Sequence, residues 1–406
     1  MGKTFSNNYP GTLKGKGGGS DIVVTKLNAA GTGLIGSLRI GGLGNDGVNI
    51  KDQLGSTMVP NATFRFYGDD SRSEVILDKS NNIYVSAQTQ SYGPDDGMPV
   101  TPGVFQPASG GDQDGTVIKI NPTCTDITWC SYLGGNNKDG AFVLAINPSN
   151  QELYVAGVTT SGNFPPTSKP GVYQSSFQGG VTDGFVSRIS NDGTTLINTT
   201  YMGTSSFDAI YGIHFDKSGI PYIMGVTEGN WPVINAAYSN PNSKQFIAKL
   251  KPDLSGFIYS TVFGNGSARP NISPVAFLVD RCENVYISGW GGWLVPNANS
   301  ANMDGVANMP TTPDAIKTTT DNRDFYFIVI KRDASELLYG SYFGQEGGFG
   351  EHVDGGTSRY DEQGLFTRLF APIVRRTGIF LLPGVFPLRQ ACGLLPMVAV
   401  IVTWQQ

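Results

Sequence analysis

The chain repeats itself, and this repeat constrains the fold more than any other feature of the sequence. A cation closes a short apolar run five times along the 406 residues. A glycine follows that cation by fifteen residues in four copies and by thirteen in the fifth. The pairs are Lys26 and Gly41, Lys119 and Gly134, Arg188 and Gly203, Lys249 and Gly264, and Lys331 and Gly344. Such periodicity indicates similar units that stack, because one unit cannot bury its own apolar face.

One copy, over residues 183–227, predicts four short antiparallel strands. Apolar and polar residues alternate over 183–189, and further strands are expected over 196–202, 209–215 and 221–227. Asp192 and Gly193 mark a tight turn, since this dipeptide tolerates the positive φ that a hairpin demands. A proline-rich segment then leads to the next copy. We therefore expect the four consecutive strands of one copy to form one blade.

The resulting fold prediction is an all-β chain, a β-propeller of four-stranded antiparallel blades. Residues 20–364 contain about five recognisable blades. Partial strands at the two ends predict six or seven blades in the intact domain. Residues 1–10 resemble 224–232, so residues 1–19 are expected to be the last strand of a truncated blade and its crossover. We expect one propeller domain over 1–364, with long insertions at 46–72, 92–111 and 292–322 that carry binding sites.

Composition excludes several classes of protein. A net charge of −5 without a Lys/Arg cluster argues against a nucleic-acid partner. No apolar run is long enough to predict membrane insertion. Four cysteines are too few for a disulfide scaffold. Cys124 and Cys130 could bridge one hairpin, or could equally remain free and half-buried.

Eight sequence motifs carry a family resemblance. They lie at residues 100–106, 114–119, 132–135, 154–159, 279–292, 309–315, 320–326 and 351–359. The first four resemble the SBBP-type β-propeller repeats of bacterial surface proteins. The later series is similar to large cell-surface or secreted proteins of the Bacteroidota, which continue into a gliding-motility-associated C-terminal domain and use type IX secretion. The resemblance implies an extracellular propeller, located at the cell surface, within a longer multidomain chain.

The resemblance ends near Gly364. Residues 365–406 depart from the family pattern, which would continue with a Cys-x-x-Cys segment and a closing strand. Codons that encode this stretch can spell that continuation in a displaced frame. We therefore expect an aberrant tail over 365–406, a frame-shifted remnant of the last blade.

His352, Asp354 and Arg359 form the first candidate ligand site. Gly355 and Gly356 allow close backbone approach, and an arginine can hold a carboxylate or a sugar through two hydrogen bonds. The alternative is a hydrogen-bonded loop that joins one blade to the next.

Three tryptophans, Trp231, Trp290 and Trp293, are further candidate ligand-binding residues. Flat aromatic faces beside polar groups suit a sugar or a protein partner. Aromatic residues also fill the space between packed sheets, and this second interpretation stays open.

Acidic turns supply a candidate calcium site. Asp95, Asp96, Asp112 and Asp114 bring carboxylates into short loops, and calcium prefers six to eight oxygen ligands. No complete EF-hand loop is present, and turn hydrogen bonding explains each acidic residue equally well. No other cofactor is predicted.

Functionally, the sequence favours a non-catalytic module that binds or scaffolds a glycan, matrix or surface-protein ligand. No nucleophile–base arrangement, zinc spacing or phosphate-binding loop appears. A carbohydrate-active propeller enzyme of the sialidase or lyase type is the alternative, and a purely structural spacer is a third possibility.

Overall fold

The computed structural model describes residues 1–47, 72–93, 95, 97–164, 171–291, 304–344 and 347. Elsewhere it gives only the backbone bounds of short strands. Within the described residues the chain is almost entirely β-structure, and the one helical element is the 3-10 turn η2 (Arg332–Ala334). The predicted all-β class is therefore confirmed.

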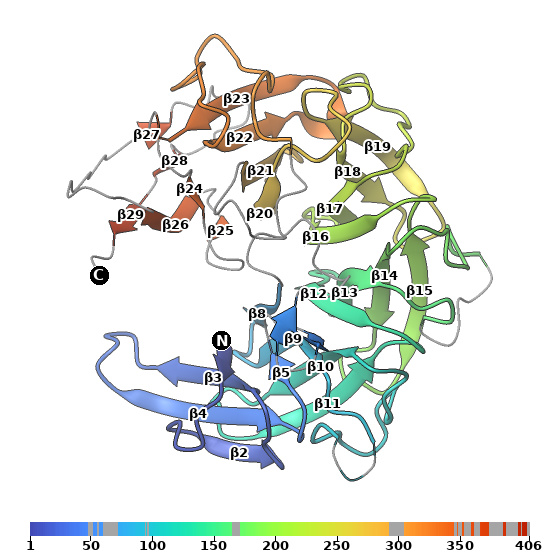
Figure 1. The fold of residues 1–406 in the computed structure, drawn as a ribbon, viewed down its shortest axis with the longest axis vertical. Coiled ribbons are helices and arrows are strands. Elements are labelled where there is room, and N and C mark those ends of the chain that lie inside the picture. Colours follow the sequence, from blue (N-terminus) through green and yellow to red (C-terminus); the bar gives the residue numbers. More distant parts are fainter. Residues whose placement is uncertain are drawn as a thin grey trace. The chain divides into compact units, whose positions relative to one another are not determined.

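Five sheets hold the described strands, and we number them in chain order (Figure 1). Sheet 1 contains, in spatial order, β1 (Gly2–Thr4), β3 (Asp21–Leu27), β4 (Leu34–Gly41) and β2 (Thr12–Gly15). Sheet 2 contains β5 (Asp46–Gly47) and β8 (Glu74–Leu77), both paired with β9 (Ile83–Thr89), followed by β10 (Asp114–Ile120) and β11 (Ile127–Leu133). Sheet 3 contains β12 (Asp139–Ile146), β13 (Leu153–Thr159), β14 (Asp183–Ile189) and β15 (Leu196–Met202).

Sheets 4 and 5 follow the same order. Sheet 4 contains β16 (Asp208–Phe215), β17 (Pro221–Thr227), β18 (Gln245–Leu250) and β19 (Phe257–Phe263). Sheet 5 contains β20 (Ser273–Val279), β21 (Val285–Trp290), β22 (Phe325–Ile330) and β23 (Leu337–Phe343). Within the pairings given for these sheets, β2 with β4 is the single parallel one.

Eight further strands are known by their bounds alone. They are β6 (Asp52–Leu54), β7 (Thr57–Val59), β24 (Glu351–His352), β25 (Arg359–Tyr360), β26 (Phe366–Pro372), β27 (Val385–Phe386), β28 (Met397–Val398) and β29 (Val400–Thr403). Apart from these bounds, the predicted aberrant tail over 365–406 lies outside the described residues.

The four strands predicted for the 183–227 copy all form, but they do not share one sheet. β14 and β15 complete sheet 3, whereas β16 and β17 begin sheet 4. The long proline-rich segments join the two middle strands of one sheet, as residues 228–244 do between β17 and β18. Short turns such as 203–207 lead from one sheet to the next. The prediction that the four strands of one copy form one unit is therefore wrong, because two of them belong to the next sheet.

Hydrogen bonds to the outermost strand explain this difference. In sheet 3 the long connection runs beside β15, where Tyr201 N donates to Gln174 O at 3.0 Å. The Gln174 side chain then accepts from Gly203 N at 2.8 Å and donates to Gly203 O at 2.9 Å. Gln106 makes the same pair of bonds with Gly134 in sheet 2, each at 3.1 Å. The glutamine amide thus donates and accepts the two hydrogen bonds that a backbone residue of a further strand would make. These bonds hold the connection against its own sheet.

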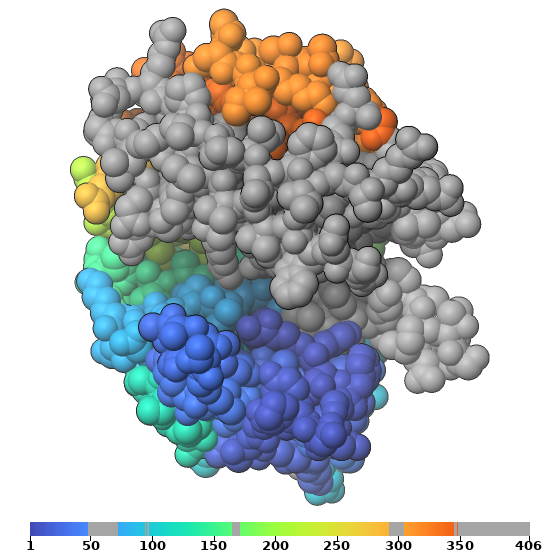
Figure 2. All heavy atoms as spheres, turned by 90° about the vertical axis from the view of Figure 1, so that its left-hand side faces the viewer, coloured from blue at the N-terminus to red at the C-terminus, as the bar shows by residue number. Residues whose placement is uncertain are grey.

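The chain divides into two compact units. The first comprises Met1–Phe64, Asp70–Ile213 and Asp253–Ser255, and the second comprises Arg65–Asp69, His214–Pro252 and Gly256–Gln406. In the first unit, Ile22 of sheet 1 and Ile118 of sheet 2 belong to one buried apolar cluster. A second cluster joins sheet 2 to sheet 3 through residues that include Phe185. Neighbouring sheets of this unit therefore bury each other's apolar side chains. The residues of sheet 1 lie at its surface, dark blue in Figure 2.

The repeated cation and the repeated tyrosine face each other on neighbouring strands. Lys119 lies opposite Tyr84 in the strand register, with Nζ 5.0 Å from the centre of the ring. Equivalent contacts join Arg188 to Tyr154 at 5.6 Å and Lys249 to Tyr222 at 5.0 Å. A cation over an aromatic face contributes about 0.5–2 kcal/mol, depending on its desolvation. This contact explains why the two residue types recur together in the sequence.

A search of the described residues for an apolar helix long enough to cross a membrane finds no candidate.

Candidate functional site

Six buried aspartates recur at the strand ends of the first unit, and we call them the paired aspartates. In each pair, the first member begins the last strand but one of a sheet, counted along the chain. The second member begins the first strand of the next sheet. Each side chain is at most 3% exposed. The pairs are Asp21 with Asp46, Asp114 with Asp139, and Asp183 with Asp208.

Two of the second members, Asp46 and Asp139, are satisfied as carboxylates. Asp139 accepts from the hydroxyls of Thr159 and Ser161 and from Gly135 N, the last at 2.6 Å. Asp46 has the same three kinds of donor, namely a threonine, a serine and a glycine N–H. A buried carboxylate needs such donors, because it has lost the water that solvates its charge.

The first members are less well satisfied. Asp114 Oδ2 accepts from Gly110 N at 2.7 Å, and Asp183 Oδ2 accepts from Gln178 N at 2.6 Å. Their Oδ1 atoms are buried without a hydrogen-bond partner, and so is Oδ1 of Asp21. In the part of the chain that the structure describes, Asp21 is the one member with a cation beside it, since Arg39 Nε lies 3.2 Å from its Oδ2.

The repeated glycines make room for the first members. A Cβ atom at Gly134 would lie 2.1 Å from Asp114 Oδ1, and one at Gly203 would lie 2.2 Å from Asp183 Oδ1. At Gly41 the same atom would meet Asp21 Oδ1 at 2.2 Å. Real side chains do not tolerate such separations, so this contact explains the constant spacing from cation to glycine.

Burial shifts the titration of these groups strongly. It raises the pKa of Asp183 to about 8, outweighing the hydrogen bond from Gln178, and the charge of Asp208 adds to the rise. Burial likewise raises the pKa of Asp114 to about 8, that of Asp139 to about 7 and that of Asp46 to about 6. The pKa of Asp21 is also raised by burial, against the opposing charge of Arg39.

Burial also limits what the pairs can do chemically. Glycoside hydrolysis requires two carboxylates that flank a bound sugar. The paired aspartates lie inside the protein, so a sugar cannot reach them. Their role is therefore in the junctions between sheets.

In the second unit, a lysine, an asparagine and an ion pair occupy the positions that correspond to the paired aspartates. In sheet 3, Asp183 lies opposite Thr159 in the strand register. In sheet 4, Thr227 N donates to Lys244 O, so Lys244 occupies the position that corresponds to Asp183. Asn271 accepts the loop N–H from Asn265 at 3.1 Å, as Asp139 accepts from Gly135. In sheet 5, the buried Asp324 forms an ion pair with Lys317 at 2.9 Å.

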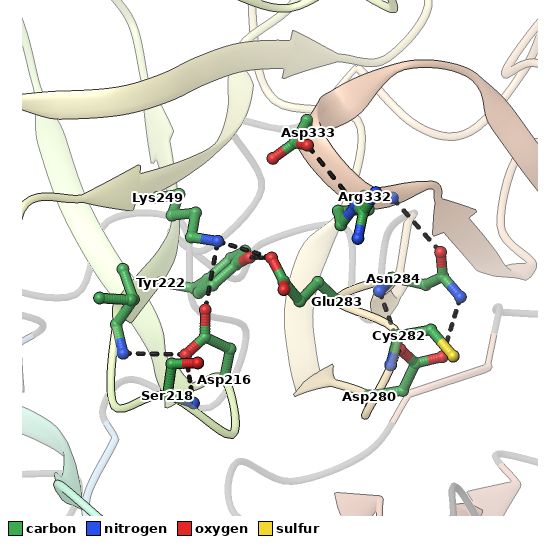
Figure 3. A network of polar contacts seen from close by, with 11 residues as sticks. Asp216, Ser218, Tyr222, Lys249, Asp280, Cys282, Glu283, Asn284, Arg332 and Asp333 are labelled. Atoms are coloured by element: carbon green, nitrogen blue, oxygen red, sulfur yellow. Dashed lines mark hydrogen bonds and ion pairs between the residues drawn. The ribbon is translucent and has the colours of Figure 1, made fainter. Parts of the chain in front are cut away.

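A different buried network joins sheets 4 and 5 within the second unit (Figure 3). Lys249 Nζ lies 2.6 Å from Glu283 Oε2 and 3.2 Å from Asp216 Oδ2. Tyr222 donates its hydroxyl proton to Glu283 at 3.3 Å. Asp216 also closes its own turn by accepting from Ser218 N at 2.9 Å.

Charge governs what this network can do. Burial alone would lower the pKa of Lys249, but its bonds to Glu283 and Asp216 prevail and raise it. Burial alone would raise the pKa of Glu283, but Lys249 prevails and lowers it. The lysine therefore stays an ammonium, which is a poor base and nucleophile, and the network acts as a joint between two sheets.

The residues of the predicted calcium site do not come together in the described part of the chain. Asp112 and Asp95 are exposed, Asp114 is buried in its pair, and Asp96 lies outside the described residues. Within those residues, no group of three or more His, Cys, Asp or Glu side chains is placed to hold a metal ion.

The predicted ligand residues fall into two groups. Trp231 and Trp290 are buried, at 6% and 2% exposure. Trp231 stacks on Phe246 at 3.5 Å and donates from Nε1 to Ser260 Oγ at 2.8 Å. This is the packing role that the sequence also allowed. Asp354, Trp293 and the side chains of His352 and Arg359 lie outside the described residues.

Cys124 and Cys130 do not form the candidate disulfide, because both cysteines are free and buried, which is close to the other alternative that the sequence left open. Cys124 Sγ donates to Val24 O of sheet 1 at 3.4 Å. Cys130 Sγ instead lies 3.9 Å from Thr116 Oγ1 on the neighbouring strand. The two thiols face different strands, and both fill the apolar cluster between sheets 1 and 2.

The pairing of the aspartates was missed at the sequence level. The available signal was an aspartate five residues after the repeated glycine, at Asp46, Asp139 and Asp208. Asp114 stood out only as a member of an acidic turn, because nothing local shows that it meets Asp139.

Comparison with known proteins finds no family model and no curated protein that matches the chain.

Proposed function

We propose that the chain is a non-catalytic β-propeller module that binds or scaffolds a glycan or surface-protein ligand on the outside of a bacterial cell. It would be one part of a longer, exported protein of the SBBP-repeat type. The five similar sheets support this proposal, since repeated four-stranded sheets are the building units of propellers.

The observation that carries the binding role is the ordering of the long connections. In sheet 2, Tyr132 donates its hydroxyl to Ser91 O at 2.7 Å and accepts from Met98 N at 3.0 Å. Tyr201 makes the same two bonds with Ser161 O and Phe164 N in sheet 3. In sheet 5, the Tyr342 hydroxyl donates to Met309 O at 3.1 Å.

These tyrosines hold connections of different sequence in one recurrent manner. A fixed frame that carries variable segments is the usual arrangement of a recognition surface. Tyr92 lies on the connection of sheet 2 and is 55% exposed, which makes it a suitable contact for a sugar ring or a protein.

Binding of the full chain to an immobilised glycan array tests the proposal. We expect Tyr92→Ala to weaken binding about tenfold, which corresponds to ~1.4 kcal/mol. Leu77→Ala is the matched control, because Leu77 is also 55% exposed but lies on β8 and not on a connection. Release of cleaved sugar would favour the enzyme alternative. Failure to bind any glycan or surface protein would favour the spacer.

A further inference from the structure

We propose that Asp183 is a neutral carboxylic acid in the folded protein, and that its proton keeps the junction between β14 and β16 closed. This inference concerns the first compact unit and is independent of any ligand. It makes the junction a pH-sensitive joint, which weakens when the proton is lost.

The hydrogen bonds around Asp183 are those of an acid and not of an anion. Oδ2 has one donor, Gln178 N, while Oδ1 is buried without a partner. An ionised carboxylate would leave that oxygen unsolvated at a substantial cost. A proton on the carboxyl group removes this cost, because it cancels the charge.

Among the described residues, no cation compensates Asp183. The facing titratable groups are Asp208 from β16 and Tyr201 from β15. Asp208 Oδ2 accepts from both N and Oγ1 of Thr204, at 2.5 and 2.8 Å, whereas Asp183 has a single donor, so Asp208 is the better suited of the two to carry the charge. Two buried anions side by side repel each other, so the pair is stable with one proton.

The junction is narrow where the two carboxyl groups meet. Asp208 N donates to Thr182 O at 2.9 Å, directly beside Asp183. A Cβ at Gly203 would lie 2.2 Å from Asp183 Oδ1, and one at Gly184 would lie 2.9 Å from Ile210 Cγ1. This lack of space leaves no room for water to solvate a second charge.

A proton explains the site better than a metal ion. In the part of the chain that the structure describes, no third acidic, cysteine or histidine group joins the pair. The rise of the pKa of Asp183 to about 8 through burial agrees with a proton held at neutral pH.

The sign of the pH effect follows from this rise. The unfolded chain loses the proton near the ordinary aspartate pKa of 3.8, whereas the folded chain keeps it to a pKa of about 8. Stability is therefore complete below the first value and falls as pH rises toward the second. The other raised aspartates act in the same direction, so Asp183 accounts for one proton of the total slope.

Thermal unfolding of the full chain between about pH 5 and about pH 8.5 tests the proposal. We expect the Tm of Asp183→Asn to fall less steeply with rising pH than that of the wild type, by the contribution of one proton. At the alkaline end its Tm should match or exceed the wild-type value. Asp208→Asn removes the repelling neighbour, so it should move the fall to lower pH. Asp78→Asn is the control, because the pKa of Asp78 is lowered by its hydrogen bonds despite burial.

Infrared difference spectroscopy supplies a direct readout. A carbonyl band of a neutral acid should be present in the wild type near neutral pH and diminished in Asp183→Asn. An unchanged band together with an unchanged Tm profile would overturn the proposal. A calcium-dependent rise in Tm that disappears in Asp183→Asn would also overturn it, since the occupant would then be a metal ion.

Discussion

The two compact units solve the same problem of buried charge in opposite ways. The first holds three pairs of aspartates, and within the described ranges the ion pair of Arg39 with Asp21 is the one that places a cation beside a member. The second has Lys244 and Asn271 at the corresponding positions of sheet 4 and the ion pair of Lys317 with Asp324 in sheet 5. The strand order of sheet 3 in the first unit recurs in sheets 4 and 5, so between these sheets the difference lies in the side chains. A repeat can keep its backbone and exchange protonation for ion pairing.

The largest effect should come from filling the space beside a first member. Gly203→Ala would place a methyl group 2.2 Å from Asp183 Oδ1, and we expect a loss of about 4 kcal/mol in the free energy of unfolding. Chemical denaturation measures this loss. Gly162→Ala is the control, since nothing lies within 4 Å of a Cβ at that position. Equal stability of the two variants would contradict the close contact.

Removal of the central cation of the second unit should have the next largest effect. Lys249→Met leaves the buried Asp216 and the partly buried Glu283 without their partner, so we expect a loss of about 3 kcal/mol. Lys331→Met is the matched control, because its pair with Glu336 is solvent-exposed and should contribute less than about 1 kcal/mol. Chemical denaturation measures both losses. Equal losses would show that burial does not determine how much an ion pair contributes to stability.

The pH dependence of the two units should run in opposite directions. In the first unit, the raised pKa values of Asp114 and Asp183 make stability fall by about 1.4 kcal/mol per pH unit per group between about pH 4 and pH 8. In the second, the lowered pKa of Glu283 gives stability that is lost as pH falls below 4.5, the ordinary pKa of a glutamate. Hydrogen exchange read by mass spectrometry, corrected for the intrinsic rate, separates the units. Parallel trends would refute the contrast.

The smallest effect concerns two tyrosine hydroxyls. Tyr222→Phe removes a hydrogen bond to the charged Glu283, and Tyr238→Phe removes one to the neutral Asn240. We expect losses of about 1.5 and about 1 kcal/mol, because bonds to charged groups are stronger. Thermal denaturation of both variants checks the order. A larger loss for Tyr238→Phe would contradict the expected strength of the bond to the charged group.

Much of the candidate site was visible in the sequence only as spacing. The interval from Arg188 to Gly203 marked the repeat, but the reason for the glycine is the carboxyl group of Asp183, which lies in another strand. Trp231 and Trp290 looked like contacts for a ligand, since a tryptophan near a loop end has the same sequence pattern whether it is exposed or buried. Burial depends on neighbours that are distant in the chain.

The sequence by itself determined the strands, their turns and the period of the repeat, because alternation and turn residues act over a few neighbouring positions. Only the tertiary structure decided which strands share a sheet, since that depends on Gln174 and its equivalents fastening each long connection to its own outer strand. It also decided that Cys124 and Cys130 face different strands and that Asp183 meets Asp208. These are encounters between residues far apart in sequence, and packing alone brings them together.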